Sequence, residues 1–198
     1  MALPTAAPER TLSHHRSIDV RIYARDDGLW EVDAQVRDVR ARDAHMATGL
    51  LPAGSPIHDM LLRLVVDAQF NVIESGAQTT ARPYPGVCEN HGDAYARLAG
   101  LNLLQGFRHA VKERLGGVQG CTHITELGQL LPTAVMQAFA GQVLDMSGSA
   151  PSSEKPRQID RCHALRSDSP AVRQYYPRWY RRPAGADATP VHKPETPP

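Results

Sequence analysis

Thiol and imidazole side chains concentrate in four short stretches of this sequence, and three of the stretches also contain glycine or proline. They are GSPIHDM with His58 and Asp59, PGVC with Cys88, GGVQGCTH with Cys121 and His123, and the pair Cys162-His163. Thiolates, neutral imidazoles and carboxylates bind transition metals, and the same groups serve as nucleophile and base in covalent catalysis. The sequence therefore offers candidates for a metal site or for a catalytic thiol.

Cys121 is the strongest of these candidates because it stands where a long helix is expected to begin. The positive end of a helix dipole favours a thiolate, which is the form that binds metals and attacks carbonyl carbons. Glycines at 116, 117 and 120 precede it and permit another segment to approach closely.

We expect His58, Cys88, Cys121 and His123 to converge on one metal site, with Asp59 as a ligand or beside the ligands. Two thiolates and two imidazoles suit tetrahedral zinc, and mixed ligation also suits an iron–sulfur cluster, so these are the candidate cofactors. The sequence contains no Cys-x-x-Cys, no His-Glu-x-x-His and no glycine-rich phosphate loop. Segments that are distant in the sequence must therefore assemble the site.

Two other interpretations stay open. In the first, the chain is an enzyme for acyl or thioester substrates, with Cys121 as nucleophile, His58 as its base and Asp59 orienting the base. His58 is preferred over His123 because side chains two residues apart on a helix point about 200° apart. In the second, the chain is a non-catalytic interaction module. Each lone cysteine is then a small buried hydrophobe, and each loop histidine satisfies a backbone carbonyl.

The expected fold is α+β, with an antiparallel sheet of two hairpins followed by covering helices. Apolar and polar residues alternate over 18–22 and 30–36 around the turn Asp26-Asp27-Gly28, which predicts the first hairpin. Residues 60–66 and 72–80 form the second. Helices are expected over 92–99, over 101–115, and around the helical spacing of Ile124, Leu127, Leu131, Val135 and Phe139.

Composition shifts divide the chain into five segments. We expect a disordered start (1–16), one α+β domain (17–146), a Ser/Pro-rich linker (147–158), a tail segment that docks on the domain (159–182) and a disordered end (183–198). The tail segment mixes aromatic and arginine side chains, a mixture that is enriched at protein interfaces and suits a protein partner. These side chains are Tyr175, Tyr176, Trp179, Tyr180, Arg173, Arg178, Arg181 and Arg182.

Charge and cysteine content restrict the function classes. The 198 residues carry a formal net charge of +1, which implies no general attraction to nucleic acid or to an anionic membrane. The three cysteines are an odd number and widely spread, which does not fit a disulfide framework. The N-terminus lacks the order of a secretion signal, so we expect a cytoplasmic protein with reduced thiols.

Four stretches of the sequence resemble the bacterial family called domain of unknown function 2889. They are RIYARDDGLWEVDAQVRD, GSPIHDMLLRLVVD, GVQGCTHITEL and IDRCHALRSDSPAVRQYYPRWY, so the resemblance runs from about Ser17 to Tyr180. The family's name implies no activity.

The order of elements also resembles the NifU-like iron–sulfur cluster scaffold proteins, in which three cysteines converge at one end of the fold. In this resemblance His58 takes the place of the first cysteine, and Cys88 and Cys121 match the second and third. The sequence departs from those proteins in the longer loop before Cys88, in the missing glycine beside it, and in Gly120, where they have a histidine. The resemblance implies cluster assembly or carriage.

Overall fold

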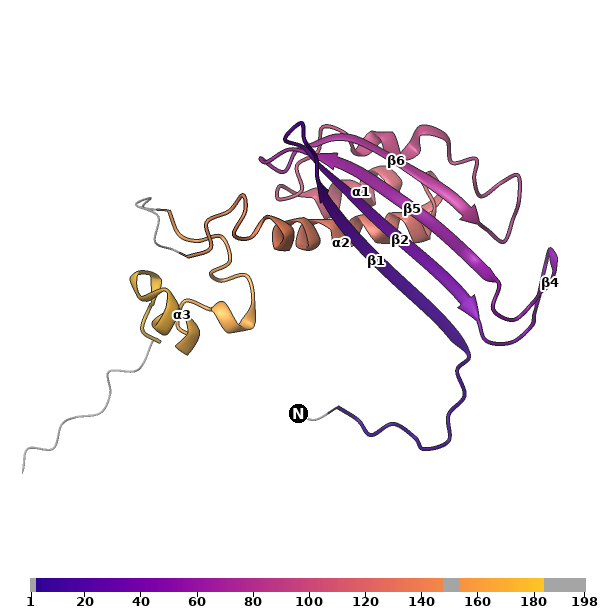
Figure 1. The fold of residues 1–198 in the computed structure, drawn as a ribbon, viewed down its shortest axis with the longest axis horizontal. Coiled ribbons are helices and arrows are strands. Elements are labelled where there is room, and N and C mark those ends of the chain that lie inside the picture. The colour runs from indigo at the N-terminus through magenta and orange to yellow at the C-terminus, as the bar shows by residue number, and fades with distance from the viewer. Residues whose placement is uncertain (1–2, 148–153, 184–198) are drawn as a thin grey trace, which may run out of the picture. The chain divides into compact units, whose positions relative to one another are not determined.

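A four-stranded antiparallel sheet of order β1-β2-β5-β6 organises the N-terminal part of the chain, with helices α1 and α2 on one of its faces (Figure 1). The computed structural model describes residues 3–147 and 154–183. The α+β class and the two hairpins are thereby confirmed. The main elements are β1 (His14–Ala24), β2 (Trp30–Arg40), β5 (Pro56–Val66), β6 (Val72–Ala81), α1 (Phe107–Leu115) and α2 (Thr122–Phe139).

Alternation along the strands decides which face of the sheet the helices cover. On β2, Val32, Ala34 and Val36 are buried, and they lie on the same face as the buried Met60, Leu62 and Leu64 of β5. The intervening residues form the opposite, outer face. On β2 they are polar or charged, and on β5 they include the apolar Leu61 and Val65. A left-handed glycine, Gly28 with φ of 81°, closes the first hairpin, as a tight turn requires.

The two long helices cover the inner face with apolar stripes at helical spacing. Every third or fourth residue of α2 is buried (Ile124, Leu127, Leu131, Val135), and α1 buries Phe107, Val111 and Leu115. Gly128 lets the two helices approach closely, because a Cβ at this position would lie 3.2 Å from Val111 Cγ1. α2 continues through Pro132 to Phe139.

The helix expected over 101–115 is shorter than predicted and begins only at Phe107. Asn102 Oδ1 accepts a hydrogen bond from the amide of Leu104 at 3.0 Å, and Gly106 has a left-handed φ of 66°. Both features hold the preceding residues in turns, a competition that apolar spacing does not reveal.

Several short elements complete the structure. The strands β3 (Ala44–Met46) and β4 (Gly49–Leu51) form a small hairpin that the sequence pattern did not indicate. The helix expected over 92–99 is a 3₁₀ helix, η1 (Gly92–Leu98), and a second one, η2 (Gly117–Gln119), precedes α2. Within the described residues, no helix is both long and apolar enough to cross a bilayer.

Contacts divide the chain into two units, 1–138 and 139–198, and the domain boundary expected after residue 146 stays a prediction. β1 begins at His14, three residues before the expected start of the domain at 17. Residues 148–153 of the expected linker, and all of the expected disordered end except Pro183, lie outside the described residues.

The second unit has a small interior of its own. Ile159 and Val172 are buried, and Ser169 caps α3 (Pro170–Tyr175) by accepting from the amide of Val172. The remaining elements are the 3₁₀ helices η3 (His163–Leu165) and η4 (Pro177–Trp179). Docking of the 159–182 segment on the first unit stays a prediction.

Candidate functional site

Asp38 is a carboxylate buried at a position where the strand pattern calls for an apolar residue. It follows Val32, Ala34 and Val36 on the inner face of β2 and is 1% exposed. A buried charge is costly unless it is fully paired. Its partners therefore define the polar centre of this end of the sheet.

Four nitrogen atoms surround the carboxylate of Asp38. Arg16, its neighbour on β1, donates from Nε to Oδ1 and from Nη2 to Oδ2, both at 2.8 Å. His14 Nε2 lies 3.0 Å from Oδ1, and His58 Nδ1, from the facing position on β5, lies 2.9 Å from Oδ2. Hydrogen bonding to Arg16 above all, and then to the two histidines, holds the pKa of Asp38 well below its usual range despite burial.

This ionisation fixes which nitrogen of His58 carries a proton. An ionised carboxylate only accepts hydrogen bonds, so Nδ1 of His58 must donate to Asp38. When the ring is neutral, Nε2 of His58 keeps its lone pair and can accept a proton or bind a metal. A carboxylate behind an imidazole in this way fixes the orientation of the ring.

His123 of α2 brings a third imidazole to the cluster that Asp38 forms with Arg16, His14 and His58. Its ring centroid lies 3.8 Å from that of His58, and its Nε2 lies 3.9 Å from Asp38 Oδ2. Burial lowers the pKa of His123, and the nearby positive charge of His58, when protonated, and of Arg16 lowers it further. The neutral ring, with one nitrogen lone pair, is therefore favoured near pH 7.

The thiol of Cys121 lies on the other side of His123. Cys121 Sγ is 3.8 Å from His123 Nδ1 and 3.6 Å from the sulfur of buried Met60. Cys121 stands just before the first residue of α2, and its carbonyl accepts the amide of Thr125, as in a helix cap. The angular argument against His123 fails here because a cap residue does not have helical dihedral angles.

Tyr95 of η1 holds the backbone of Cys121. The hydroxyl of Tyr95 accepts from the amide of Cys121 at 2.8 Å and donates to its carbonyl at 3.0 Å, and the residue is 1% exposed. The backbone that carries the thiol is thereby fixed to η1.

Removing this hydroxyl is expected to destabilise the fold. Tyr95→Phe leaves the buried amide of Cys121 without its partner, which costs about 1–2 kcal/mol of unfolding free energy in urea titrations. Tyr84, 51% exposed, supplies the control Tyr84→Phe, which should change the free energy by less than about 0.5 kcal/mol. Equal effects of the two variants would contradict a special role of Tyr95.

The structure brings together some of the predicted site residues and separates others. His58, Cys121 and His123 share one cluster. Asp59 does not join it, since neighbouring strand residues alternate and Asp59 lies on the outer face, bound by Gln35 Nε2 at 2.6 Å. His58 and Asp59 also belong to strand β5 rather than to the loop expected before a strand.

Cys88 also stays apart from the cluster. It lies in a turn, where its amide donates to the carbonyl of Tyr84. Within the described part of the chain, the His, Cys, Asp and Glu side chains with ligand atoms all within 4.8 Å of one another are Asp38, His58 and His123. Cys162, in the second unit, is exposed.

Sequence reasoning missed the charged members of the cluster. They are Arg16, Asp38 and Glu126, and the candidates derived from the sequence also leave out His14 and Met60. A signal for Asp38 exists in the alternation of β2, which places a charge on the apolar face. Glu126 belongs with them because its Oε2 accepts from Arg16 Nη1 at 3.0 Å.

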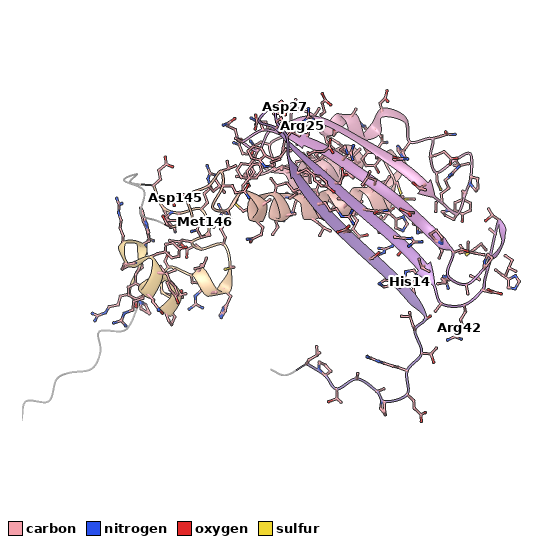
Figure 2. All side chains as sticks on the ribbon, viewed as in Figure 1. His14, Arg25, Asp27, Arg42, Asp145 and Met146 are labelled. Carbon is pink, nitrogen blue, oxygen red and sulfur yellow. The ribbon has the colours of Figure 1, made fainter. Side chains whose placement is uncertain are left out.

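The cluster lies at one end of the sheet. Figure 2 shows His14 at the start of β1, at the end of the sheet opposite the turn that carries Arg25 and Asp27. Cavities of about 390 and 210 Å³ lie elsewhere, on the outer face, where Leu61 and Gln78 line both.

The family model described as "Protein of unknown function (DUF2889)" matches residues 14–137, which include the sheet, η1, α1 and most of α2. The expected extension of the resemblance to Tyr180 lies outside this match. No curated protein and no solved structure matches the chain, so the likeness to NifU-like scaffolds stays a prediction. Since the matched residues span more than half of the chain and contain every member of the cluster, the chain belongs to the DUF2889 family of proteins of unknown function.

Proposed function

We propose that the protein binds a single transition metal ion through His58, Cys121 and His123. The observation that carries the proposal is the 3.8 Å separation between Cys121 Sγ and His123 Nδ1. A sulfur and a nitrogen bound tetrahedrally to one zinc ion lie about 3.5 Å apart, from Zn–S and Zn–N bonds of about 2.3 and 2.0 Å. These two atoms need only a small movement to share an ion. His58 must move farther to join them, because the described side chains with ligand atoms within 4.8 Å of one another are Asp38, His58 and His123, without Cys121.

Asp38 supports the ligands from behind rather than binding the ion. Its two oxygens already accept from Arg16, His14 and His58, so a direct bond to a metal would displace one of these donors. The hydrogen bond to His58 Nδ1 leaves Nε2 as the ligand atom. Carboxylates commonly orient metal-bound histidines in this way.

The charge around the site favours a cation even though Arg16 is close. Arg16 contacts two carboxylates, Asp38 and Glu126, so the three side chains together carry a charge of −1. A thiolate at Cys121 adds a second negative charge, and the lowered pKa of His123 keeps its ring neutral and available.

The sulfur of Met60 extends the donor set toward soft ions. It lies 3.6 Å from Cys121 Sγ, a distance that also suits two sulfurs on one ion. Thiolate with thioether and imidazole is a donor set that monovalent copper accepts, whereas zinc rarely binds a thioether. Zinc and monovalent copper are therefore the ions to test, and an iron–sulfur cluster, which needs several thiolates, is less well supported.

Metal content and cobalt titration test the proposal. Protein purified without chelators should contain close to one equivalent of zinc or copper, and the metal-free protein should take up one Co²⁺ with sulfur-to-cobalt charge-transfer absorption and a tetrahedral d–d spectrum. Absence of bound metal together with a cobalt spectrum lacking sulfur ligation would refute it.

The order Asp38–His123–Cys121 supports a second candidate, a nucleophilic thiol. The separations of 3.9 and 3.8 Å place one ring nitrogen of His123 toward the carboxylate and the other toward the thiol. This candidate predicts that metal-free protein is alkylated by iodoacetamide at Cys121 faster than at exposed Cys162, and that His123→Ala removes the difference. Slower alkylation of Cys121 than of Cys162 would contradict it.

A further inference from the structure

β1 is an edge strand of 11 residues with one free side. It pairs with β2 along its whole length, from His14 opposite Arg40 to Ala24 opposite Trp30. In the described parts of the chain no strand pairs with its other side, and Figure 1 shows it as the indigo strand at the border of the sheet. Long unprotected edges tend to pair with another strand.

The sequence of β1 is complementary to itself when reversed. Val20 is the centre of Ile18-Asp19-Val20-Arg21-Ile22. Asp19 and Arg21 stand on either side of the valine, and an isoleucine stands at each end. If two copies pair antiparallel about Val20, Asp19 of each copy faces Arg21 of the second copy, and Ile18 of each faces Ile22. Facing pairs of opposite charge and of β-branched residues stabilise antiparallel strands.

The exposure of these side chains fits such a pairing. Ile18 is 40% exposed although it lies on the inner, apolar face. Asp19 and Arg21 lie on the outer face, with 49% and 66% of their side chains exposed, and form an ion pair within the strand at 2.6 Å. A second copy would bury the isoleucines and convert this ion pair into two pairs between chains.

The other edge of the sheet does not offer the same features. β6 packs against η1, where Ser75 Oγ donates to the carbonyl of Tyr95 at 2.7 Å. Its sequence VIESGAQTTA has Glu74 as its charged residue and provides no basic partner for it. Of these two edge strands, β1 is therefore the one whose charges are complementary to a second copy of itself.

We propose that the protein forms a homodimer through β1, with two chains antiparallel about Val20 and their four-stranded sheets joined into one. In this register Arg16, which bonds to Asp38, faces Ala24 of the second copy. The dimer edge therefore ends beside the candidate site. The proposal does not depend on metal binding.

Charge reversal at the two complementary positions gives a direct test. Sedimentation velocity and light scattering should find wild-type dimers at micromolar concentration. Asp19→Arg or Arg21→Asp alone places like charges opposite each other at two positions, so each single variant should raise the dimer dissociation constant about tenfold or more. The double variant D19R/R21D restores both pairs and should dimerise like the wild type.

Mixing the two single variants separates the interface from an effect on the strand itself. One chain then carries two positive charges at positions 19 and 21 and the other two negative ones, so the mixture should form heterodimers of wild-type affinity. An intrachain role of the ion pair cannot be rescued in this way.

Glu74→Arg on β6 is the control and should leave the dimer unchanged, with circular dichroism confirming the fold of every variant. A monomeric wild type, single variants that dimerise as well as the wild type, or a mixture of the two single variants that stays monomeric would overturn the proposal.

Discussion

Asp38→Asn is expected to lower the free energy of unfolding by about 3–5 kcal/mol, measured by urea denaturation with circular dichroism. Asp38 is 1% exposed and accepts hydrogen bonds from Arg16, His14 and His58. Asparagine has the same shape, but its NH₂ group would point a donor at donors. The loss of charge would also leave the guanidinium of Arg16 beside a neutral group.

A second Arg–Asp fork on the same strand supplies the matched control. Asp33 accepts from Arg63 Nε and Nη2, both at 2.6 Å, but it lies on the outer face, where 48% of the arginine side chain is exposed. Water competes for such a pair, so Asp33→Asn should cost at most about 1 kcal/mol. Equal losses of unfolding free energy in the two variants would show that the burial of Asp38 does not determine how much its charge stabilises the fold.

The effect of Asp38→Asn should also depend on pH in a known direction. The pKa of Asp38 is lowered in the folded state, so the unfolded chain binds the proton more readily. The stabilisation by Asp38 is present above the unfolded-state pKa, about 3.9, and is lost as the pH falls from there through the lower pKa of the folded state. The part of the stability difference that comes from ionised Asp38 should therefore shrink as the pH falls below about 4.

The strand pattern was sufficient to predict the sheet and its hairpins, because alternation such as Val32, Ala34 and Val36 encodes one buried face. The start of α1 was harder to predict. The side chain of Asn102 and the left-handed Gly106 delay α1 to Phe107, and such local hydrogen bonds compete with apolar spacing without disturbing it.

The candidate site was predictable only in part, for a reason that lies in strand register. His58, Cys121 and His123 could be singled out by residue type. The partner of His58 is Asp38, which faces it across β2 and β5 just where a register shift follows, and no pattern within either strand specifies that pairing. The same alternation that brings His58 inward turns Asp59 to the outer face. Without knowing that residues 56–60 belong to β5, a prediction from the sequence could not tell that His58 points inward and Asp59 outward.

Cys121→Ser is expected to weaken metal binding by about 100-fold or more, measured by competition with a chromophoric chelator, because it removes the sulfur ligand at the centre of the donor set. Cys88→Ser is the matched control and should leave the affinity unchanged, since Cys88 lies in a separate turn.

Met60→Leu conserves volume and should cost less than about 1.5 kcal/mol of stability. It should lower the affinity for monovalent copper while leaving that for zinc unchanged, because only the softer ion gains from the thioether. If Cys88→Ser abolishes binding as Cys121→Ser does, the ion is held by a different set of ligands; if Met60→Leu weakens zinc and copper equally, the thioether acts through packing and not as a ligand.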